Sequence, residues 1–430
     1  MDTIHALASG AVPSGVAVIR VSGPDARTAC ERITGETPRP GLVGLRALRH
    51  PETGALLDHG LVLWFAGPRS FTGEDVLELH VHGGPAVVEA VSDALEALPG
   101  LRPAERGEFT RRAFENGRMD LTEVEGLADL IASETEAQRR LAVAQEGGAL
   151  RRLYEGWAER LLHARAMLEA EFDFADEDDV PDDAARDTLD AVRAVADEMR
   201  AHLARGREGE IVRDGLRVAL LGPPNAGKSS LLNAMVERDA AIVSDVPGTT
   251  RDVVEVVLER SGMRVIVSDT AGLRDATDVV EREGVRRARK AAERADLRLW
   301  LSPADAPAPP EVDDVTVLAS RADLAPTDLV PAEGPAVSVR APDGLADLWR
   351  IVDERLTRLR PDGEALPTRA RHRRGVRDAL VALEEAIDAP LDEVRADRLR
   401  AAADALGRIT GRTDVEDLLG AVFAEFCVGK

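Results

Sequence analysis

The segment GPPNAGKSS (residues 222–230) constrains this chain more than any other part of its sequence. It follows an apolar run, LRVAL (216–220), and precedes a second one, LLNAMV (231–236). A strand, a glycine-rich turn ending in Gly-Lys-Ser and a helix, in this order, form a phosphate-binding loop. In such a loop backbone N–H groups and the helix N-terminus surround the phosphates, Lys228 bridges the β- and γ-phosphates, and Ser229 ligates Mg²⁺. The segment therefore predicts a nucleotide-binding α/β domain.

The spacing of apolar residues divides the 430-residue chain, which is longer than one hydrophobic core usually serves. Strand-like runs occur at 15–23, 60–65 and 75–84. Apolar residues at helical spacing follow from Leu121 to about residue 204 and again from 375 to 426, and strands alternate with helices in between. The predicted domains are an N-terminal α+β domain (1–118), a discontinuous helical domain (119–213 with 371–430) and an inserted α/β domain (214–370).

Charge and composition limit the possible functions. A net charge of −23 argues against broad binding of a phosphate backbone, so a nucleic acid has to be met locally or through a partner. No run of about 18 uncharged apolar residues is present, which predicts a soluble, cytoplasmic protein without a membrane segment. The two cysteines, Cys30 and Cys427, are too far apart in sequence to suggest a disulfide framework or a metal knuckle.

Two groups of side chains could be taken for metal sites. The acidic segment 171–183 is dense in carboxylates, but no ligand geometry is evident, and like charges at this density repel and stay solvated, which favours an acidic loop between helices. His80 and His82 flank Val81 on a predicted strand, and no third ligand is evident. We favour polar surface roles for both groups.

Two further segments follow the phosphate-binding loop in the order found in GTPases. DVPGTTRD (245–252) has the character of switch I, in which Thr250 completes the Mg²⁺ shell when a γ-phosphate is present. DTAG (269–272) ends an apolar strand and places Asp269 behind the Mg²⁺ ion and the Gly272 N–H near the γ-phosphate. Together the segments predict a GTPase rather than an ATPase.

The base-reading segment is less regular. SRAD (320–323) follows the strand-like run DVTVLA, where GTPases usually carry Asn-Lys-x-Asp. Asp323 can accept from guanine N1 and N2, a pairing that adenine does not offer. Ser320 is shorter than the usual asparagine and Arg321 replaces a lysine, so we expect GTP selectivity with loose binding. The segment 338–340 stands where a Ser-Ala-Lys loop normally donates a backbone N–H to guanine O6, and a backbone contact tolerates these changes.

Catalysis must differ from that of Ras-type enzymes. Leu273 occupies the position of the glutamine that orients water in Ras, and leucine cannot do so. Candidates for the missing functions are Glu281, which is otherwise a solvated helix carboxylate, and a monovalent cation held near Asn225.

All of these segments contribute to the predicted GTP site, whose members are Asn225, Ala226, Gly227, Lys228, Ser229, Ser230, Ser244, Asp245, Val246, Pro247, Gly248, Thr249, Thr250, Asp269, Thr270, Ala271, Gly272, Ser320, Arg321, Ala322, Asp323, Ser338, Val339 and Arg340.

Over nearly its whole length the sequence resembles the bacterial tRNA-modification GTPases called MnmE or TrmE. The resemblance rests on DTIHALAS, RVSG, SFTGEDVLELHVHGGP, the segment 102–131, the GTPase motifs and the final FCVGK. It implies a multidomain α/β and α+β fold: an N-terminal tetrahydrofolate-binding-like α+β domain, a discontinuous helical domain and an inserted Ras-like P-loop G domain.

The resemblance also implies partners and a reaction. Members are homodimers through the N-terminal domain and form a heterotetramer with the flavoprotein MnmG, which supplies FAD. Together they place an aminomethyl or carboxymethylaminomethyl group on C5 of the wobble uridine (position 34) of certain tRNAs. The one-carbon unit is thought to come from a 5-formyl- or methylene-tetrahydrofolate.

Site roles follow from the same resemblance. The implied Mg²⁺ ligands are Ser229 and Thr250, and Glu281 matches the glutamate that orients water. The remaining implied sites are K⁺ at Asn225, Ser244, Val246 and Thr249; folate at Arg20, Glu78, Arg118 and Lys430; and Cys427 as either a reactive thiol or a buried structural one.

An alternative remains from a different class: a regulatory or ribosome- and RNA-assembly GTPase that performs no covalent modification. The sequence leaves open which tRNAs are modified and whether glycine or ammonium is the nitrogen donor.

Overall fold

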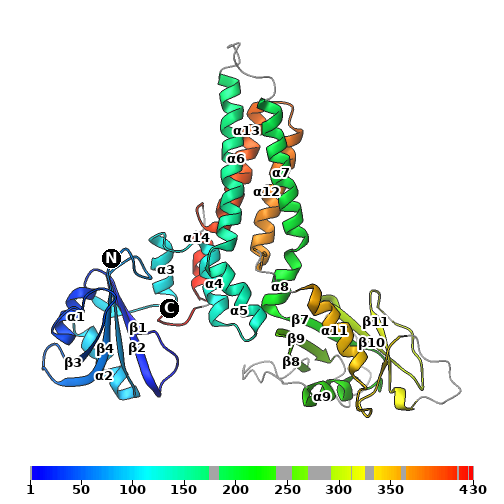
Figure 1. Ribbon diagram of the computed structural model, residues 1–430, viewed down its shortest axis with the longest axis horizontal. Helices are drawn as coiled ribbons and strands as arrows, with labels where there is room; N and C mark the ends of the chain where they lie inside the picture. The colour runs from blue at the N-terminus through cyan, green and yellow to red at the C-terminus, as the bar shows by residue number, and fades with distance from the viewer. Residues whose placement is uncertain are drawn as a thin grey trace. The chain divides into compact units, whose positions relative to one another are not determined.

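The computed structural model (Figure 1) describes residues 2–173, 184–238, 254–269, 292–310, 312–324, 334–359, 365–413, 416–424 and 426–429. The chain forms two compact units, the first made of residues 1–128, 146–162 and 400–430, the second of 129–145 and 163–399.

A six-stranded sheet forms the N-terminal part of the first unit. Its strands are β1 (Thr3–Leu7), β2 (Ser14–Ser22), β3 (Val43–Arg49), β4 (Leu56–Phe65), β5 (Val76–Gly83) and β6 (Leu101–Pro103). They lie in the order β3-β4-β5-β2-β1-β6, and among the described strands of this sheet only β1 and β6 pair in parallel. The structure confirms the three predicted strands as β2, β4 and β5, and it adds β1, β3 and β6.

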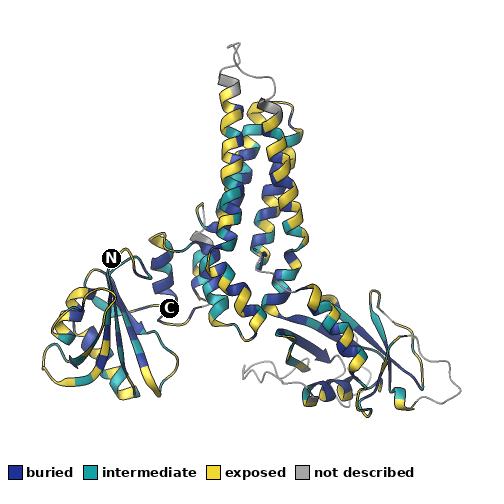
Figure 2. Cartoon of the chain, viewed as in Figure 1, coloured by how far each residue is buried: buried dark blue, intermediate teal, exposed yellow. Residues whose placement is uncertain are grey.

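Helices α1 (Ala26–Thr34) and α2 (Pro85–Glu96) cover one face of this sheet. Alternate residues of each strand point to that face, so Ile19, Val62 and Leu79 are buried against Ala29 and Val91 of the two helices. The opposite face carries the remaining alternate residues of β2 to β5, and several of them are exposed (Figure 2).

Helix α3 (Glu108–Glu115) is held to the sheet by buried charges. Arg112 has a side chain that is 6% exposed and forms ion pairs with Glu74, Asp2 and Glu108. A buried guanidinium is tolerated because its donors reach carboxylate and carbonyl oxygens on both sides.

Long helices make up much of the rest of the chain. Their bounds are α4 (Leu121–Ile131), α5 (Glu136–Glu146), α6 (Ala149–Asp173), α7 (Ala184–Ala204), α8 (Gly206–Asp214), α12 (Ala370–Asp388), α13 (Asp392–Thr410) and α14 (Glu416–Ala424). Helices α7 and α12 lie side by side (Figure 1). The polar segment 206–214, beyond the helical pattern that was predicted to end at about residue 204, forms α8. Within the described ranges, no helix is both long and apolar enough to cross a bilayer.

The second sheet carries the glycine-rich segment. Its strands are β7 (Leu216–Leu221), β8 (Val254–Arg260), β9 (Met263–Asp269), β10 (Leu297–Pro303), β11 (Thr316–Ser320) and β12 (Ala336–Val337). The order is β12-β11-β10-β7-β9-β8, and the pairs are parallel except for β8 with β9. A parallel sheet of this kind gathers its loops at the carboxyl ends of the strands, where ligands bind.

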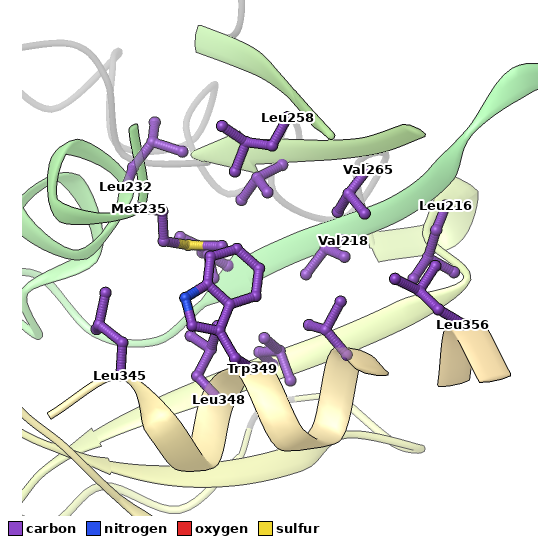
Figure 3. Close-up of a cluster of buried hydrophobic side chains, with 14 of the residues drawn as sticks. Leu216, Val218, Leu232, Met235, Leu258, Val265, Leu345, Leu348, Trp349 and Leu356 are labelled. Carbon is purple, nitrogen blue, oxygen red and sulfur yellow. The ribbon is translucent and has the colours of Figure 1, made fainter. Parts of the chain in front are cut away.

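Two helices pack on one face of this sheet around a large apolar core (Figure 3). Helix α9 (Lys228–Arg238) contributes Met235, and α11 (Ala346–Arg358) contributes Leu348 and Trp349. These side chains meet Val218 and Val265 of the central strands. The core fixes α9 against β7 and so fixes the loop that joins them.

Candidate functional site

The loop between β7 and α9 has a backbone conformation that depends on its glycines. Gly222 has φ +138°, and a Cβ there would lie 2.5 Å from the carbonyl oxygen of Leu301 on the adjacent β10. Gly227, just before α9, has φ +93°, and Asn225 has φ +62°. Asparagine is among the few non-glycine residues that adopt this conformation readily. The loop therefore requires positive φ angles at three positions between the end of β7 and the start of α9.

Lys228 is held over this loop. Its ammonium is buried, with 6% of the residue exposed, and Nζ donates to the carbonyl oxygens of Gly222 and Pro223 at 2.8 Å each. Burial lowers the pKa of Lys228, and the Asp269 carboxylate acts in the opposite direction. These contacts place a cation at the mouth of the loop, where polyphosphate charge has to be offset.

Ser229 and Asp269 meet although 40 residues separate them. The Ser229 hydroxyl donates to Oδ2 of Asp269 at 2.6 Å. Asp269 ends β9, and the pairing of β7 with β9 sets Leu220 opposite it, which brings both ends to the same edge of the sheet. Hydroxyl and carboxylate oxygens are ligands that Mg²⁺ prefers, so the two side chains fit a magnesium ion with a nucleotide phosphate.

Arg321 links the predicted base-reading segment to the loop. It follows β11 with φ +57°, and its Nη1 donates to the carbonyl oxygen of Asn225 at 3.4 Å. The other arm of the guanidinium forms an ion pair of 2.8 Å with Asp305, which follows β10. The arginine thus bridges two loops at the carboxyl edge of the sheet.

Asp323 lies one turn further along, in the 3₁₀ helix η1 (Ala322–Leu324). Its Oδ1 accepts from the Ser338 hydroxyl at 2.7 Å, and its Oδ2 lies 3.7 Å from Nη1 of Arg340. Ser320, at the end of β11, is 3% exposed, and its Oγ has no hydrogen-bond partner within the described part of the chain. The segments 320–323 and 338–340 therefore meet at Asp323.

Several predicted site residues lie outside the described ranges. They are Ser244, Asp245, Val246, Pro247, Gly248, Thr249, Thr250, Thr270, Ala271, Gly272, Glu281 and Lys430.

A second constellation occupies the face of the N-terminal sheet that α1 and α2 leave uncovered. Nε and Nη2 of Arg20 both donate to Oε1 of Glu78, at 3.0 and 2.8 Å, and His80 lies 3.3 Å from Oε2. The Arg20 guanidinium also stacks near the rings of Phe71 and Phe109, at 5.4 and 5.8 Å from their centroids. Phe109 is fully buried, whereas Phe71 is partly exposed, so the surface combines a cation, a carboxylate and one aromatic ring, which suits a planar heterocycle carrying carboxylates.

The C-terminal segment lies against the N-terminal sheet. Val428 forms a backbone bridge with Arg106, and a Cβ on Gly429 would overlap the carbonyl oxygen of Leu7. Cys427, between them, is exposed, which argues against the buried structural thiol, whereas Cys30 is buried. Arg118 is exposed, and its Cγ would lie 3.3 Å from a Cβ added at Gly73.

Of the two groups that could be taken for metal sites, the structure describes the histidine pair fully and the acidic segment only in part. His80 pairs with Glu78 and His82 with Asp58, at 3.3 and 2.8 Å. No group of three potential ligands suited to a metal ion occurs among the described histidine, cysteine, aspartate and glutamate residues. Most of the acidic segment 171–183 lies outside the described ranges.

Sequence reasoning did not find Phe71, Phe109 or Asp305. Phe71 and Phe109 stand within the segments 70–85 and 102–131 on which the family resemblance rests, but only the fold brings both rings to Arg20. Asp305 has no recognisable pattern around it.

The strand order, the phosphate-binding loop and the Ser229–Asp269 pair define a P-loop nucleotide-binding protein. The family model described as GTP-binding protein TrmE N-terminus matches residues 3–118, and the one described as MnmE helical domain matches 121–427. The chain belongs to the MnmE family of GTP hydrolases that act in tRNA modification.

Individual relatives match over the whole chain. The tRNA modification GTPase MnmE of Rhizobium meliloti is 51% identical over 438 residues, covering 100% of this chain and 99% of the relative. The protein of the same name from Azorhizobium caulinodans is 52% identical over 441 residues, with the same coverage. Among solved structures, the G domain of the T. maritima FeoB iron transporter is 23% identical with a TM-score of 0.24, covering 32% of this chain and 97% of that one.

Proposed function

We propose that this chain is a potassium-dependent GTPase that acts as a homodimer with an MnmG-type flavoprotein. The complex adds an aminomethyl or carboxymethylaminomethyl group to C5 of the wobble uridine of certain tRNAs. One observation carries the proposal: the same chain, a member of this family, has both a phosphate-binding loop around Lys228 and the Arg20–Glu78 pair on an open sheet face.

The GTP part of the proposal assigns roles to the loop. Lys228 and the N-terminus of α9 bind the phosphates, and Asp323 reads guanine N1 and N2. Ser229 and Thr250 would hold Mg²⁺, which when bound offsets phosphate charge. Asn225, exposed in its left-handed conformation, would offer its side-chain oxygen to K⁺ together with Ser244, Val246 and Thr249. Glu281 would position the attacking water.

The folate part rests on the chemistry of the second constellation. Glu78 can accept from the amide and amino edge of a pterin, while Arg20 and Arg118 suit the carboxylates of a folate tail. The segment 426–429 lies along the same domain, which supports the assignment of Lys430, the next residue, to the tail. Phe71, which is partly exposed beside Arg20, would flank the ligand ring.

The homodimer is supported by the uncovered face of the N-terminal sheet. Strand register sets Val43, Leu63, Glu78 and Arg20 in one row across β3, β4, β5 and β2, and residues directly opposite each other share a face. Leu45 and Leu61 begin the next row and are 66% and 42% exposed. Exposed apolar side chains beside the Arg20–Glu78 pair fit a second copy of this chain.

The test of the GTPase mechanism is hydrolysis by the full chain in K⁺ compared with Na⁺ at equal ionic strength. We expect faster turnover in K⁺, and we expect Asn225→Ala to abolish that difference. Equal rates in the two salts would refute the potassium assignment while leaving GTP binding intact.

The modification itself is tested by deleting the gene and analysing tRNA nucleosides by mass spectrometry. Loss of the C5 group from wobble uridines is expected. Unchanged wobble uridines would instead favour the regulatory or assembly GTPase.

A further inference from the structure

The guanine end of the nucleotide site contains a buried hydroxyl where a longer amide is usual. Ser320 is 3% exposed and its Oγ lacks a partner within the described residues. A serine side chain ends one atom beyond Cβ, so it cannot extend toward the outer edge of a base as an asparagine amide can. Guanine O6 and N7 are the acceptors on that edge. A backbone N–H of the segment 338–340 is expected to reach only O6, so N7 lacks the donor that an asparagine amide would supply.

Arg321 does not meet that need. One arm of its guanidinium is engaged by Asp305 at 2.8 Å, and the other donates to the carbonyl oxygen of Asn225 at 3.4 Å. These contacts commit the side chain to joining two loops.

Arg340 has the required freedom and position. Its side chain is 73% exposed, and its Nη1 lies 3.7 Å from Oδ2 of Asp323. Its backbone is anchored, because its N–H donates to the Ser338 hydroxyl at 3.2 Å, and the same hydroxyl donates to Asp323 at 2.7 Å. The guanidinium is thus tethered beside the carboxylate while it remains free to turn.

We propose that the Arg340 guanidinium reads O6 and N7 of guanine, replacing the contact that Ser320 is too short to make. This rests on the assignment of guanine N1 and N2 to Asp323. O6 adjoins N1 on the ring, so a group beside the Asp323 carboxylate lies beside O6. The planar fork of arginine matches the O6 and N7 acceptors and is a common specific reader of guanine.

The same contact rejects adenine. Adenine presents an amino group in place of O6, and a guanidinium has only donors, so the two would oppose each other. Asp323 selects guanine on the N1 and N2 side, and Arg340 adds selection on the O6 and N7 side.

The test is calorimetric titration of the full-length chain with GDP, 7-deaza-GDP, which lacks N7, and IDP, which lacks the 2-amino group. Variants are Arg340→Ala and Arg340→Lys, with Arg350→Ala as a matched control, because Arg350 is an exposed arginine on α11 paired with Asp347 and Glu354. We expect Arg340→Ala to weaken GDP binding about 10-fold, the value of one good bidentate base contact. Arg350→Ala should bind GDP as the unmodified chain does.

The nucleotide comparison isolates the contact. The unmodified chain should bind 7-deaza-GDP about 10-fold more weakly than GDP, whereas Arg340→Ala and Arg340→Lys should bind the two nearly equally. An equal 7-deaza penalty in all variants, or unchanged GDP affinity in Arg340→Ala, would overturn the proposal. The loss on removing the 2-amino group reports on Asp323 and should persist in every variant. If IDP bound the unmodified chain as tightly as GDP does, the Asp323 assignment would be refuted instead.

Discussion

The Ser229 hydroxyl donates to Oδ2 of Asp269 at 2.6 Å, joining the first turn of α9 to the end of β9. If Ser229 holds Mg²⁺ in the GTP complex, Ser229→Ala should reduce GTP hydrolysis about 100-fold, the scale expected when one stabilising ligand of a charged transition state is removed. The affinity for GTP should also lose its dependence on Mg²⁺. Ser133→Ala, a hydroxyl deletion outside this sheet, is the control. Steady-state hydrolysis and GTP binding are each measured across a Mg²⁺ titration. GTP affinity of Ser229→Ala that still depends on Mg²⁺ would contradict the assignment.

The Arg20–Glu78 pair is expected to bind folate without affecting the GTP site. Glu78→Gln keeps the shape of the side chain but removes its charge, so the affinity for 5-formyl-tetrahydrofolate should fall about 10-fold or more. The control is Arg27→Ala, because Arg27 also stacks on an aromatic ring, Trp64, at 5.0 Å. Equilibrium dialysis measures folate, and GTP turnover should be unchanged in both variants. Equal folate affinity in Glu78→Gln and the unmodified chain would argue against this site.

A single type of substitution should have opposite effects at two glycines. Gly222 has φ +138°, and its added Cβ would lie 2.5 Å from the Leu301 carbonyl oxygen, so Gly222→Ala should destabilise the fold by about 2 kcal/mol or more and weaken GTP binding. Gly156, inside α6, has nothing within 4 Å of the added Cβ, so Gly156→Ala should stabilise by roughly 0.5–1 kcal/mol. Urea unfolding measures both changes. A neutral result at Gly222 would contradict the close approach of β7 and β10.

Asp120 should make stability depend on pH. It caps α4, since its Oδ1 accepts from the Thr122 hydroxyl and the Glu123 N–H at 2.8 Å each, and the Asp120 N–H donates to Glu123. Burial nevertheless raises the pKa of Asp120 to about 6 from 3.8. The folded chain therefore binds this proton more tightly than the unfolded chain, and the stabilisation is lost as pH rises through about 6.

Asp120→Asn removes this titration and keeps an acceptor for the cap. The free energy of unfolding of the unmodified chain, minus that of the variant, should fall by roughly 3 kcal/mol between pH 3.5 and 7.5. Urea unfolding at the two pH values measures the difference, and Asp190→Asn, on the exposed side of α7, should show no comparable change. A difference that is independent of pH would show that Asp120 is not held protonated.

The proposed homodimer predicts a specific sensitivity on β3. Leu45 is 66% exposed on the open sheet face, so Leu45→Glu should weaken self-association at least about 10-fold by placing a charge in an apolar interface. Leu162→Glu is the control, because Leu162 is 60% exposed on α6. Sedimentation analysis over a range of protein concentrations measures the change. Equal association of both variants would place the interface elsewhere.

The local sequence predicted the elements that carry chemistry. A strand, a Gly-Lys-Ser turn and a helix need only contacts within about 20 residues, so the loop at 222–230 and the position of Lys228 were predictable. The strands β2, β4 and β5 were also found, because their alternation is clear and Gly/Pro turns bound them. Strands β1, β3 and β6 and helix α8 were missed, since short or polar segments owe their structure to packing rather than to their own pattern.

Only the tertiary structure decided which distant side chains meet. Ser229 reaches Asp269 because β7 pairs with β9, and Arg20 reaches Glu78, Phe71 and Phe109 because β2 pairs with β5 while α3 docks beside them. Arg321 likewise meets Asp305 because β10 and β11 are neighbours in the sheet, and Arg340 lies beside Asp323 because β11 pairs with β12. Sequence patterns specify backbone geometry over a few residues, whereas the partners of a charged side chain are set by strand register and helix docking, which depend on the whole core.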